Sequence, residues 1–371
     1  MKKNPIASVI LLLLLAAACR ETETYDTLTP APIKALPTSV GTRATSILGV
    51  NEIYSFSLIG SATGEGLFNA ATSYPTLIRD GENHWVDVLR TNATAPWIPS
   101  AENYWWLNPK TRYTFFGFSP SYSVLTANGC QPHHSSSSVP GPPSLTYTVP
   151  QEVTRQVDLL YGNLKDIFQP ENHTVSLPMK HALAFIAFSA APMSSGIGGT
   201  EWFRFRNIKL SGNSISSARL NLMNGTWTPT TEASPFQYTI APNTVPMTTG
   251  VLYQLHTPLE APNNYLMILP LEQPEMTIQI EYQYGNGPDS DNITWEKDDD
   301  DSINTYSETA TLPRRAYQSG KIYTFTLKLT KNSFIVLPDG VNTIEDWLSD
   351  KALKYLDPTT GQYDKDYIVA E

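Results

Sequence analysis

The chain has 371 residues and a formal net charge of −10, from 25 Lys and Arg against 35 Asp and Glu. It carries no basic patch interleaved with aromatic residues, which argues against a nucleic-acid partner. Charged residues are scarce at 16%, whereas Pro (29) and Tyr (19) are plentiful. This composition is typical of short strands joined by turns and argues against a helical protein.

Residues 1–18 have the features of an export signal. Lys2 and Lys3 give a positive start, Val9 to Leu15 form an apolar run too short to span a bilayer, and small residues follow. Cys19 comes directly after them, which predicts cleavage before Cys19, lipidation of its thiol and attachment to a membrane. The alternative is an ordinary secreted protein. Removing 18 residues from 371 leaves 353, more than one hydrophobic core usually serves, so we expect two domains.

Residues 19–43 predict a flexible tether or propeptide. The stretch from residue 20 to residue 42 is rich in Thr and Pro and shows no apolar periodicity. The composition changes around Arg43 and Ala44. An arginine in a polar segment beside a domain edge is accessible to an Arg-specific protease, although any exposed arginine would be equally so.

Strand patterns begin near Ile53. Residues 113–118 (YTFFGF) and 175–188 (VSLPMKHALAFIAF) are dense apolar runs, whereas residues 277–284 (TIQIEYQY) and 323–329 (YTFTLKL) alternate with period two. Such alternation indicates half-buried antiparallel strands, and the turn residues between the runs favour β-sandwiches. We therefore predict an all-β fold with one sandwich over residues 44–175, a second over 176–346, and a C-terminal extension over 347–371.

Two stretches depart from the strand pattern. Residues 126–144 have no periodicity and predict a loop. At the other end of the chain, Asn342 or Thr343 is placed to cap a helix. Apolar residues then recur on one helical face, so residues 343–356 predict a short C-terminal helix.

No catalytic motif is present, neither a nucleophile elbow, a zinc-protease motif, a Cys-x-x-Cys pair nor a phosphate-binding glycine loop. We therefore expect a protein that is not an enzyme and has no cofactor. His133 and His134 are adjacent in the predicted loop, and only Cys130 lies near them at ligand spacing, which argues against a metal site.

The acidic run Asp298–Asp301 begins like a calcium-binding loop. Its sixth position is Ile303 where such a loop needs glycine, and its twelfth is Thr309 where it needs a bidentate glutamate. A solvated hairpin loop is the better interpretation, so we expect no metal here either.

Several segments together resemble the fimbrillin (Mfa-like) family of type V pilus subunits. The resemblance lies in the lipoprotein signal and in the following segments, in this order: residues 42–44 (TRA), 104–106 (YWW), 113–120 (YTFFGFSP), 158–161 (DLLY), 181–188 (HALAFIAF), 208–212 (IKLSG), 225–227 (GTW), 265–270 (YLMILP), 320–329 (GKIYTFTLKL) and 344–347 (IEDW).

The resemblance implies two tandem transthyretin-like β-sandwiches with Greek-key character. It implies a precursor carried to the outer membrane by lipid on Cys19 and cut after Arg43 by an Arg-specific protease, which releases the lipid and the first strand. A strand from a neighbouring subunit would then fill the groove in the first sandwich, giving an extracellular fimbria used in adhesion. A stalk and a tip subunit both fit, whereas the Arg43 site argues against an anchor subunit.

The alternative is an outer-membrane surface lipoprotein that binds a glycan or a host protein without polymerising. Its support is the aromatic set Trp97, Trp105 and Trp106, which could stack on sugars, although such residues more often pack a sandwich core. Two tripeptides, around Thr27 and Ser302, resemble sites of periplasmic O-glycosylation, and chance occurrence is the competing explanation for them.

Overall fold

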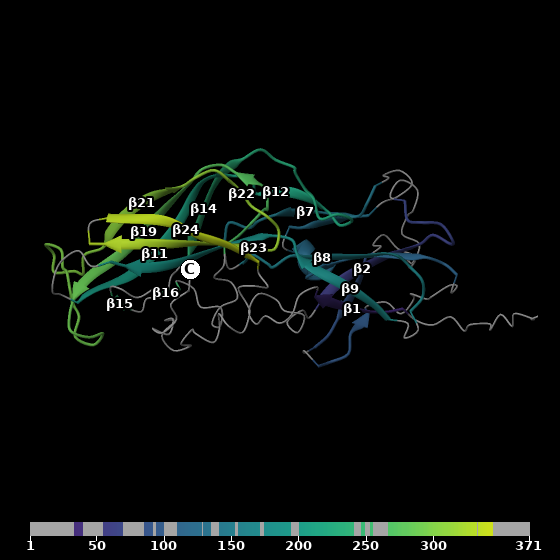
Figure 1. Cartoon of the computed structure of the whole chain (residues 1–371), viewed down its shortest axis with the longest axis horizontal. Coiled ribbons are helices and arrows are strands. Elements are labelled where there is room, and N and C mark those ends of the chain that lie inside the picture. The colour runs from purple at the N-terminus through teal and green to yellow at the C-terminus, as the bar shows by residue number, and fades with distance from the viewer. Residues whose placement is uncertain are drawn as a thin grey trace, which may run out of the picture.

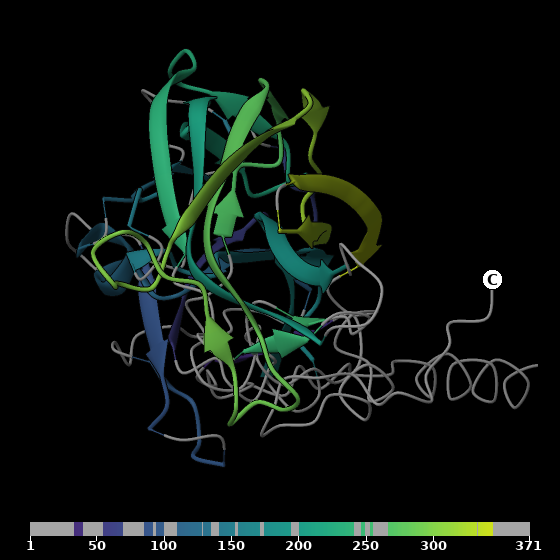
Figure 2. The same cartoon turned by 90° about the vertical axis from the view of Figure 1, so that its left-hand side faces the viewer.

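The computed structural model describes residues 33–39, 55–69, 85–91, 94–99, 110–127, 129–134, 141–152, 155–170, 174–193, 200–240, 246–248, 253–254, 266–331 and 333–343. Almost all regular structure in them is β-strand, and the strands gather into two groups along the long axis (Figure 1). The predicted all-β fold is confirmed. Figure 2 looks along that axis onto the end formed by the second group.

The first group contains a seven-stranded and a four-stranded sheet. The larger has the strand order β1-β9-β8-β5-β2-β3-β4. Its strands are β1 (Lys34–Ser39), β9 (Thr174–His181), β8 (Leu160–Ile167), β5 (Tyr113–Ser119), β2 (Ser55–Ala62), β3 (Val86–Leu89) and β4 (Ile98–Pro99). The smaller sheet has the order β13-β12-β7-β6 and consists of β13 (Trp227–Pro229), β12 (Ser217–Asn221), β7 (Ser144–Thr148) and β6 (Gln131–His133).

Among the described residues, one short helix, α2 (Tyr122–Ala127), follows β5. Its first backbone N–H groups donate to side chains of the large sheet, with Tyr122 N 3.1 Å and Ser123 N 3.3 Å from the two carboxylate oxygens of Asp87. Asp87 thereby satisfies donors that a helix start leaves without partners.

The second group also contains two sheets that face each other. The five-stranded sheet joins β16 (Tyr253–Gln254), β17 (Leu266–Ile268), β10 (Ala184–Pro192), β23 (Lys321–Thr330) and β24 (Ser333–Thr343). The six-stranded sheet joins β14 (Ser234–Ile240), β15 (Met247–Thr248), β11 (Glu201–Ser214), β19 (Met276–Asn286), β20 (Thr294–Trp295) and β21 (Tyr306–Leu312). A separate two-stranded sheet pairs β18 (Glu272–Gln273) with β22 (Arg315–Ala316).

The two sandwiches share strands. β12 and β13 come from the second half of the sequence, but β12 pairs with β7 of the first half. Two hydrogen bonds hold the hairpin formed by β12 and β13. The Trp227 indole N–H donates to the Ala182 carbonyl at 2.9 Å, and the Asn163 side-chain amide donates to the Leu222 carbonyl at 2.8 Å. The division expected between residues 175 and 176 also falls inside β9, so it does not coincide with the sheets.

Buried side chains form two clusters. The larger runs through both sandwiches and includes Phe116, Phe118, Phe185, Phe203 and Ile280. The smaller lies on the other face of the seven-stranded sheet. β19 shows the predicted alternation, because Ile278, Ile280 and Tyr282 are buried between more exposed polar residues.

Three expectations differ from the structure. β23 is buried on both faces, Thr324 and Thr326 included, so it is not the half-exposed strand that its alternation predicts. The stretch 126–144 holds the end of α2, strand β6 and the start of β7, so it is not all loop. β24 extends as a strand through Thr343, the proposed helix cap, and the rest of the predicted helix lies outside the described residues.

Candidate functional site

The strand β1 lies at one edge of the seven-stranded sheet and comes from the segment before Arg43. It pairs in parallel with β9 over six residues, from Lys34 opposite Thr174 to Ser39 opposite Met179. Figure 1 shows β1 beside β9 in the first sandwich. The edge position tolerates Pro37, whose missing N–H would interrupt a central strand.

Alternate residues of β1 face the smaller hydrophobic cluster. Ile33 and Ala35 are 6% and 9% exposed and belong to this cluster, whereas Lys34 between them is exposed. The cluster also contains the inward-facing residues of neighbouring strands, which are Phe56, Leu58, Val86, Val88, Tyr113, Phe115, Leu160, Val175, Leu177 and Met179. The pleat therefore directs one side of β1 into a core made by the rest of the sheet.

The first half of β9 depends on β1 for its strand pairing. β9 pairs with β8 only from Met179 to His181, opposite Gly162 to Leu160. Among the described strands, residues 174–178 of β9 pair with β1 alone. Pro178 has no N–H to offer, and its carbonyl oxygen would lie 2.2 Å from a Cβ built on Gly162. Loss of β1 would thus leave five backbone positions of β9 without a described strand partner.

The interpretation of residues 20–42 as a tether was wrong for Lys34–Ser39, which form β1. The alternation of Ile33 and Ala35 is difficult to recognise in the sequence, because two prolines and the pair Thr38-Ser39 surround it. The partner of β1 lies about 140 residues further along the chain, so local sequence carries no signal for this pairing.

Six of the predicted functional residues lie outside the described residues. These are the lipidation residue Cys19, the glycosylation candidate Thr27, the cleavage pair Arg43 and Ala44, and the aromatic pair Trp105 and Trp106. The roles assigned to these residues remain predictions from the sequence.

Trp97 packs against the sheet. It is half-buried, its ring lies edge-on to Phe56 at a centroid distance of 5.1 Å, and Arg90 stacks over the ring at 4.5 Å. One ring face is thus covered by a guanidinium and an edge by the core. This environment favours a packing role over the stacking of a sugar.

Ser302 is exposed in the loop after β20. The Asp298 carboxylate oxygen Oδ1 in this loop accepts the backbone N–H groups of Asp300 and Ser302 at 3.1 and 2.9 Å, and Lys297 pairs with Asp301 at 2.7 Å. The carboxylates of Asp298 and Asp301 are therefore engaged with donors of their own loop.

The histidines and the described cysteine are also engaged or buried. His133 lies in β6, with its ring nitrogen Nε2 3.2 Å from Thr146 Oγ1, and burial, followed by the nearby Arg219 and His134, lowers the pKa of its imidazole. Burial raises the pKa of the Cys130 thiol to about 12, so it stays protonated.

Within the described ranges, no three His, Cys, Asp or Glu side chains gather closely enough to hold a metal ion. No helix in the same part of the chain has the length and apolar composition required to cross a membrane.

A fimbrillin-like family model matches residues 68–347, which is more than half of the chain. The chain belongs to the fimbrillin-like family. This membership places it among fimbrial proteins of the cell surface and agrees with a structural, non-enzymatic role. No curated protein sequence matches the chain.

Solved structures show the same fold as this fimbrillin-like chain. A fimbrial protein from Bacteroides vulgatus ATCC 8482 is 15% identical, with a TM-score of 0.62 over 85% of this chain and 99% of that one. A Bacteroides ovatus ATCC 8483 protein with an inferred role in cell adhesion is 12% identical, with a TM-score of 0.50 over 85% of this chain and 97% of that one.

Proposed function

We propose that the chain is a stalk or tip subunit of a type V fimbria that assembles by exchange of β1 for a strand of a neighbouring subunit. The precursor is a lipoprotein, held at the outer membrane through Cys19. An Arg-specific protease cuts between Arg43 and Ala44, and the released subunit joins an extracellular fimbria that serves adhesion.

The observation that carries this proposal is the position of β1 relative to Arg43. β1 ends at Ser39, four residues before the arginine, and is paired with a strand that follows it by about 140 residues. A cut after Arg43 leaves β1 attached to the first sandwich by non-covalent contacts alone. The same cut separates the lipid on Cys19 from the rest of the chain.

The energetics favour exchange after the cut and oppose it before. In the precursor, β1 binds its site intramolecularly, so its effective concentration is high and a competing strand is excluded. Burial of an Ile-sized side chain contributes about 1.5–3 kcal/mol, and Ala35 contributes less. β1 therefore holds the site weakly once it becomes a separate peptide, and dilution removes it.

The site left by β1 has the features of a strand acceptor. Five backbone positions of β9 lack another described strand, and the apolar side chains of Val175 and Leu177 beside them would lose β1 as a neighbour. Such an edge is prone to bind an extended strand, which gains both main-chain hydrogen bonds and side-chain burial.

The competing function, a surface lipoprotein that binds a glycan without polymerising, relies on the aromatic residues. The packing of Trp97 between Phe56 and Arg90 does not favour it.

Limited trypsin treatment of the purified full-length precursor tests the proposal. We expect cleavage near Arg43, followed by loss of the N-terminal peptide and the appearance of polymer ladders on denaturing gels run without boiling. The Arg43→Ala variant should stay monomeric. Cleaved wild-type protein that loses β1 and yet remains monomeric at high concentration would overturn the proposal.

A further inference from the structure

We infer that the buried pair of Asp158 and His181 positions the acceptor strand for exchange, because it keeps β9 in the sheet while β1 has left and no other strand has arrived. The inference rests on the proposed function, since it concerns the acceptor after the cut. Asp158 lies two residues before β8, and His181 is the last residue of β9. They begin two of the segments that resemble fimbrillins, residues 158–161 and 181–188.

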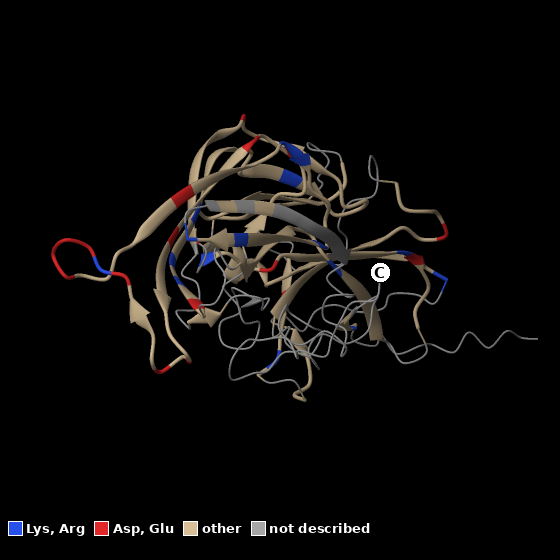
Figure 3. Ribbon diagram, turned by 60° about the vertical axis from the view of Figure 1, so that its left-hand side comes forward, with Lys and Arg blue, Asp and Glu red and all other residues tan. Residues whose placement is uncertain are grey.

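Asp158 is unusual because its carboxylate is buried. Among the described residues, Asp158 and Glu201 are the only acidic or basic ones that are buried. The others are at least partly exposed, and those of the loop after β20 form an acidic tip at one end of the molecule (Figure 3). A buried carboxylate needs a partner inside the protein, since it has lost its contact with water.

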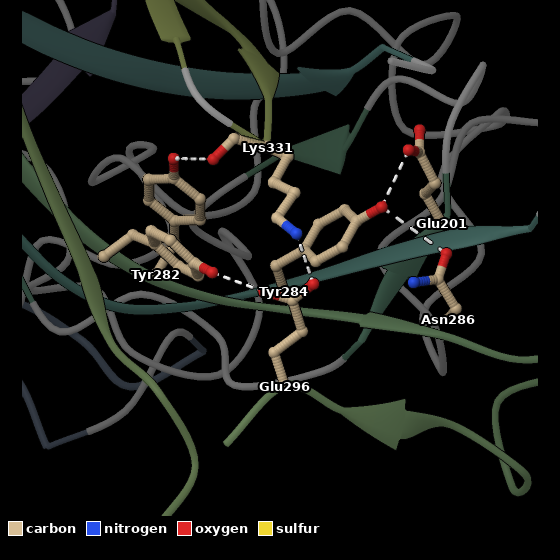
Figure 4. Close-up of polar contacts among 7 residues, drawn as sticks. Glu201, Tyr282, Tyr284, Asn286, Glu296 and Lys331 are labelled. Atoms are coloured by element: carbon tan, nitrogen blue, oxygen red, sulfur yellow. Dashed lines mark hydrogen bonds and ion pairs between the residues drawn. The ribbon is translucent and has the colours of Figure 1, made fainter. Parts of the chain in front are cut away.

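The two buried carboxylates have different partners. Glu201 in β11 accepts the hydroxyl of Tyr284 at 2.7 Å (Figure 4). Asp158 faces an imidazole instead, and His181 Nδ1 lies 3.0 Å from each of its carboxylate oxygens. The side chains of His181 and Asp158 are 13% and 5% exposed. Nδ1 is the donor, because a carboxylate can only accept, and removal of either partner would leave a buried polar group without compensation.

The pair lies at the point where β9 is attached to β8. β9 pairs with β8 only from Met179 to His181, and His181 is opposite Leu160. The next backbone N–H, that of Ala182, donates to the Leu159 carbonyl at 2.7 Å. Side chains and backbone therefore join the same two segments at one place, which fixes the register of a short ladder.

The second sandwich holds the same point from the other side. The Ala182 carbonyl accepts the Trp227 indole N–H at 2.9 Å and the Ser319 hydroxyl at 3.1 Å. The His181 ring lies edge-on to Phe185 of β10, with the ring centroids 6.1 Å apart. Residues 181 and 182 thus form a junction that both sandwiches contact.

β23 extends this support across the second sandwich. Just before β23, the Gly320 N–H donates to the Leu183 carbonyl at 2.9 Å. Just after β23, the Lys331 carbonyl accepts the Tyr282 hydroxyl at 3.0 Å, and the Lys331 ammonium donates to the Glu296 carboxylate (Figure 4). β23 is held at both ends, so the junction is supported by a fixed strand.

The importance of the pair depends on whether β1 is present. In the precursor, β1 pairs with residues 174–179 and β8 with residues 179–181, so β9 is supported along its whole length. Once β1 leaves, the described strand pairing of β9 is the short ladder beside Asp158 and His181. So few backbone bonds would allow β9 to fray, and the pair opposes this. An incoming strand then meets an acceptor that is already extended, which lowers the entropy lost on binding.

Amide hydrogen exchange in the uncleaved full chain tests the inference without polymerisation. Asp158→Leu breaks the pair, and Ile33→Asp detaches β1, so we compare wild type, each single variant and the double variant. With β1 in place, Asp158→Leu should change the exchange of residues 179–182 only slightly. With β1 detached, it should speed this exchange at least about tenfold, as expected for loss of one charge-assisted hydrogen bond.

Asp158→Asn is the matched control, because its amide oxygen still accepts from His181 Nδ1. Combined with Ile33→Asp, it should recover most of the protection that Asp158→Leu removes. Equal acceleration by Asp158→Leu with β1 docked and with β1 detached would mean that the pair stabilises the fold in general, and would overturn the inference. So would slow exchange in the double variant, or an asparagine variant that exchanges as fast as the leucine variant.

Binding of a synthetic peptide separates this inference from the proposed function. A fluorescent peptide of residues 30–43, which contains β1, is titrated into the chain cleaved near Arg43 and freed of its own N-terminal peptide. Asp158→Leu should weaken binding at least about tenfold, and Asp158→Asn should restore most of it, because a frayed β9 must first be ordered. Equal affinities for wild type and Asp158→Leu would overturn the inference. Absence of binding to cleaved wild type would refute strand exchange, whereas the exchange pattern of the uncleaved chains still decides the role of the pair.

Discussion

Leu177 of β9 packs directly against the backbone of Gly117 in β5. A Cβ built on Gly117 would lie 2.5 Å from Leu177 Cδ2 and 2.7 Å from the Ser57 carbonyl oxygen, so the glycine creates the space that this leucine fills. Leu177 belongs to the cluster that β1 also enters. The absence of one side chain in the centre of the sheet thus shapes the core beneath the β1 site.

Gly117→Ala should destabilise the first sandwich. The added methyl group meets a carbonyl oxygen that cannot move without breaking the ladder, and overpacking of this kind costs about 1–3 kcal/mol. Urea unfolding of the full chain measures the change. Gly66→Ala is the matched control, because the nearest atom to its new Cβ is the Thr63 carbonyl oxygen at 3.4 Å. Equal stabilities for the two variants would contradict the close packing described here.

Ile33→Asp should detach β1 from β9. The change removes about 1.5–3 kcal/mol of apolar burial and places a carboxylate against the smaller cluster. We expect faster amide hydrogen exchange in β1 and in residues 174–178, with the second sandwich unchanged. Lys34→Asp alters an exposed position of the same strand and should leave exchange slow. Fast exchange in both variants would mean that side-chain burial does not hold β1 in place.

Trp97→Ala should lower stability by about 1–3 kcal/mol, because the ring packs on Phe56 and carries the stacked Arg90. Trp97→Phe should recover most of that loss. Thermal unfolding gives the comparison. Unchanged stability of the alanine variant, together with loss of binding on a glycan array, would instead favour the sugar-binding alternative.

The ion pair of Glu296 and Lys331 predicts a pH window of stability. Partial burial opposes ionisation of Glu296, but hydrogen bonds from Lys331 and Tyr306 outweigh it and lower the pKa of its carboxyl. The bond to Glu296 raises the pKa of Lys331, despite some desolvation. The Glu296 contribution is therefore present above about pH 4.5 and is lost as pH falls through its lowered pKa, whereas the Lys331 contribution is lost only as pH rises through its raised pKa.

Glu296→Gln should cost about 0.5–1 kcal/mol at pH 7, since both side chains remain partly exposed. The difference from wild type should shrink as the pH is lowered below about 4, where the wild-type carboxyl is also neutral. Unfolding curves recorded from pH 3 to 8 test this. Glu275→Gln, at an exposed position where β19 is about to begin, is the control. A difference that grows toward acid pH would show that the sign is wrong.

The local alternation of apolar and polar residues was sufficient to predict long strands of the second sandwich such as β19. In β19, Ile278, Ile280 and Tyr282 alternate with polar residues, and the strand has one buried and one more exposed face. The same pattern did not predict strand β24, because its Pro338-Asp339-Gly340 segment resembles a turn. The structure accommodates this tripeptide as an irregularity, where Thr324 pairs with Gly340 and Phe325 with Pro338.

The functional surfaces depend on contacts between distant parts of the sequence. β1 is defined by its pairing with residues 174–179, and the hollow at the outer end of the first sandwich brings together Glu65, Arg112 and Phe168 from three separate loops. Short-range periodicity contains no information about such contacts. The resemblance to fimbrillins implied a first strand before Arg43, but the residues that form this strand emerged only from the structure.

The shared hairpin of β12 and β13 has a mechanical consequence. A fibre under tension transmits force through each subunit, and two independent domains would act as beads that can yield one after the other. Here the second half supplies two of the four strands that close the first sandwich, fastened through Trp227 and Asn163. The two halves should therefore unfold in one cooperative transition, so each subunit resists extension as a single stiff link.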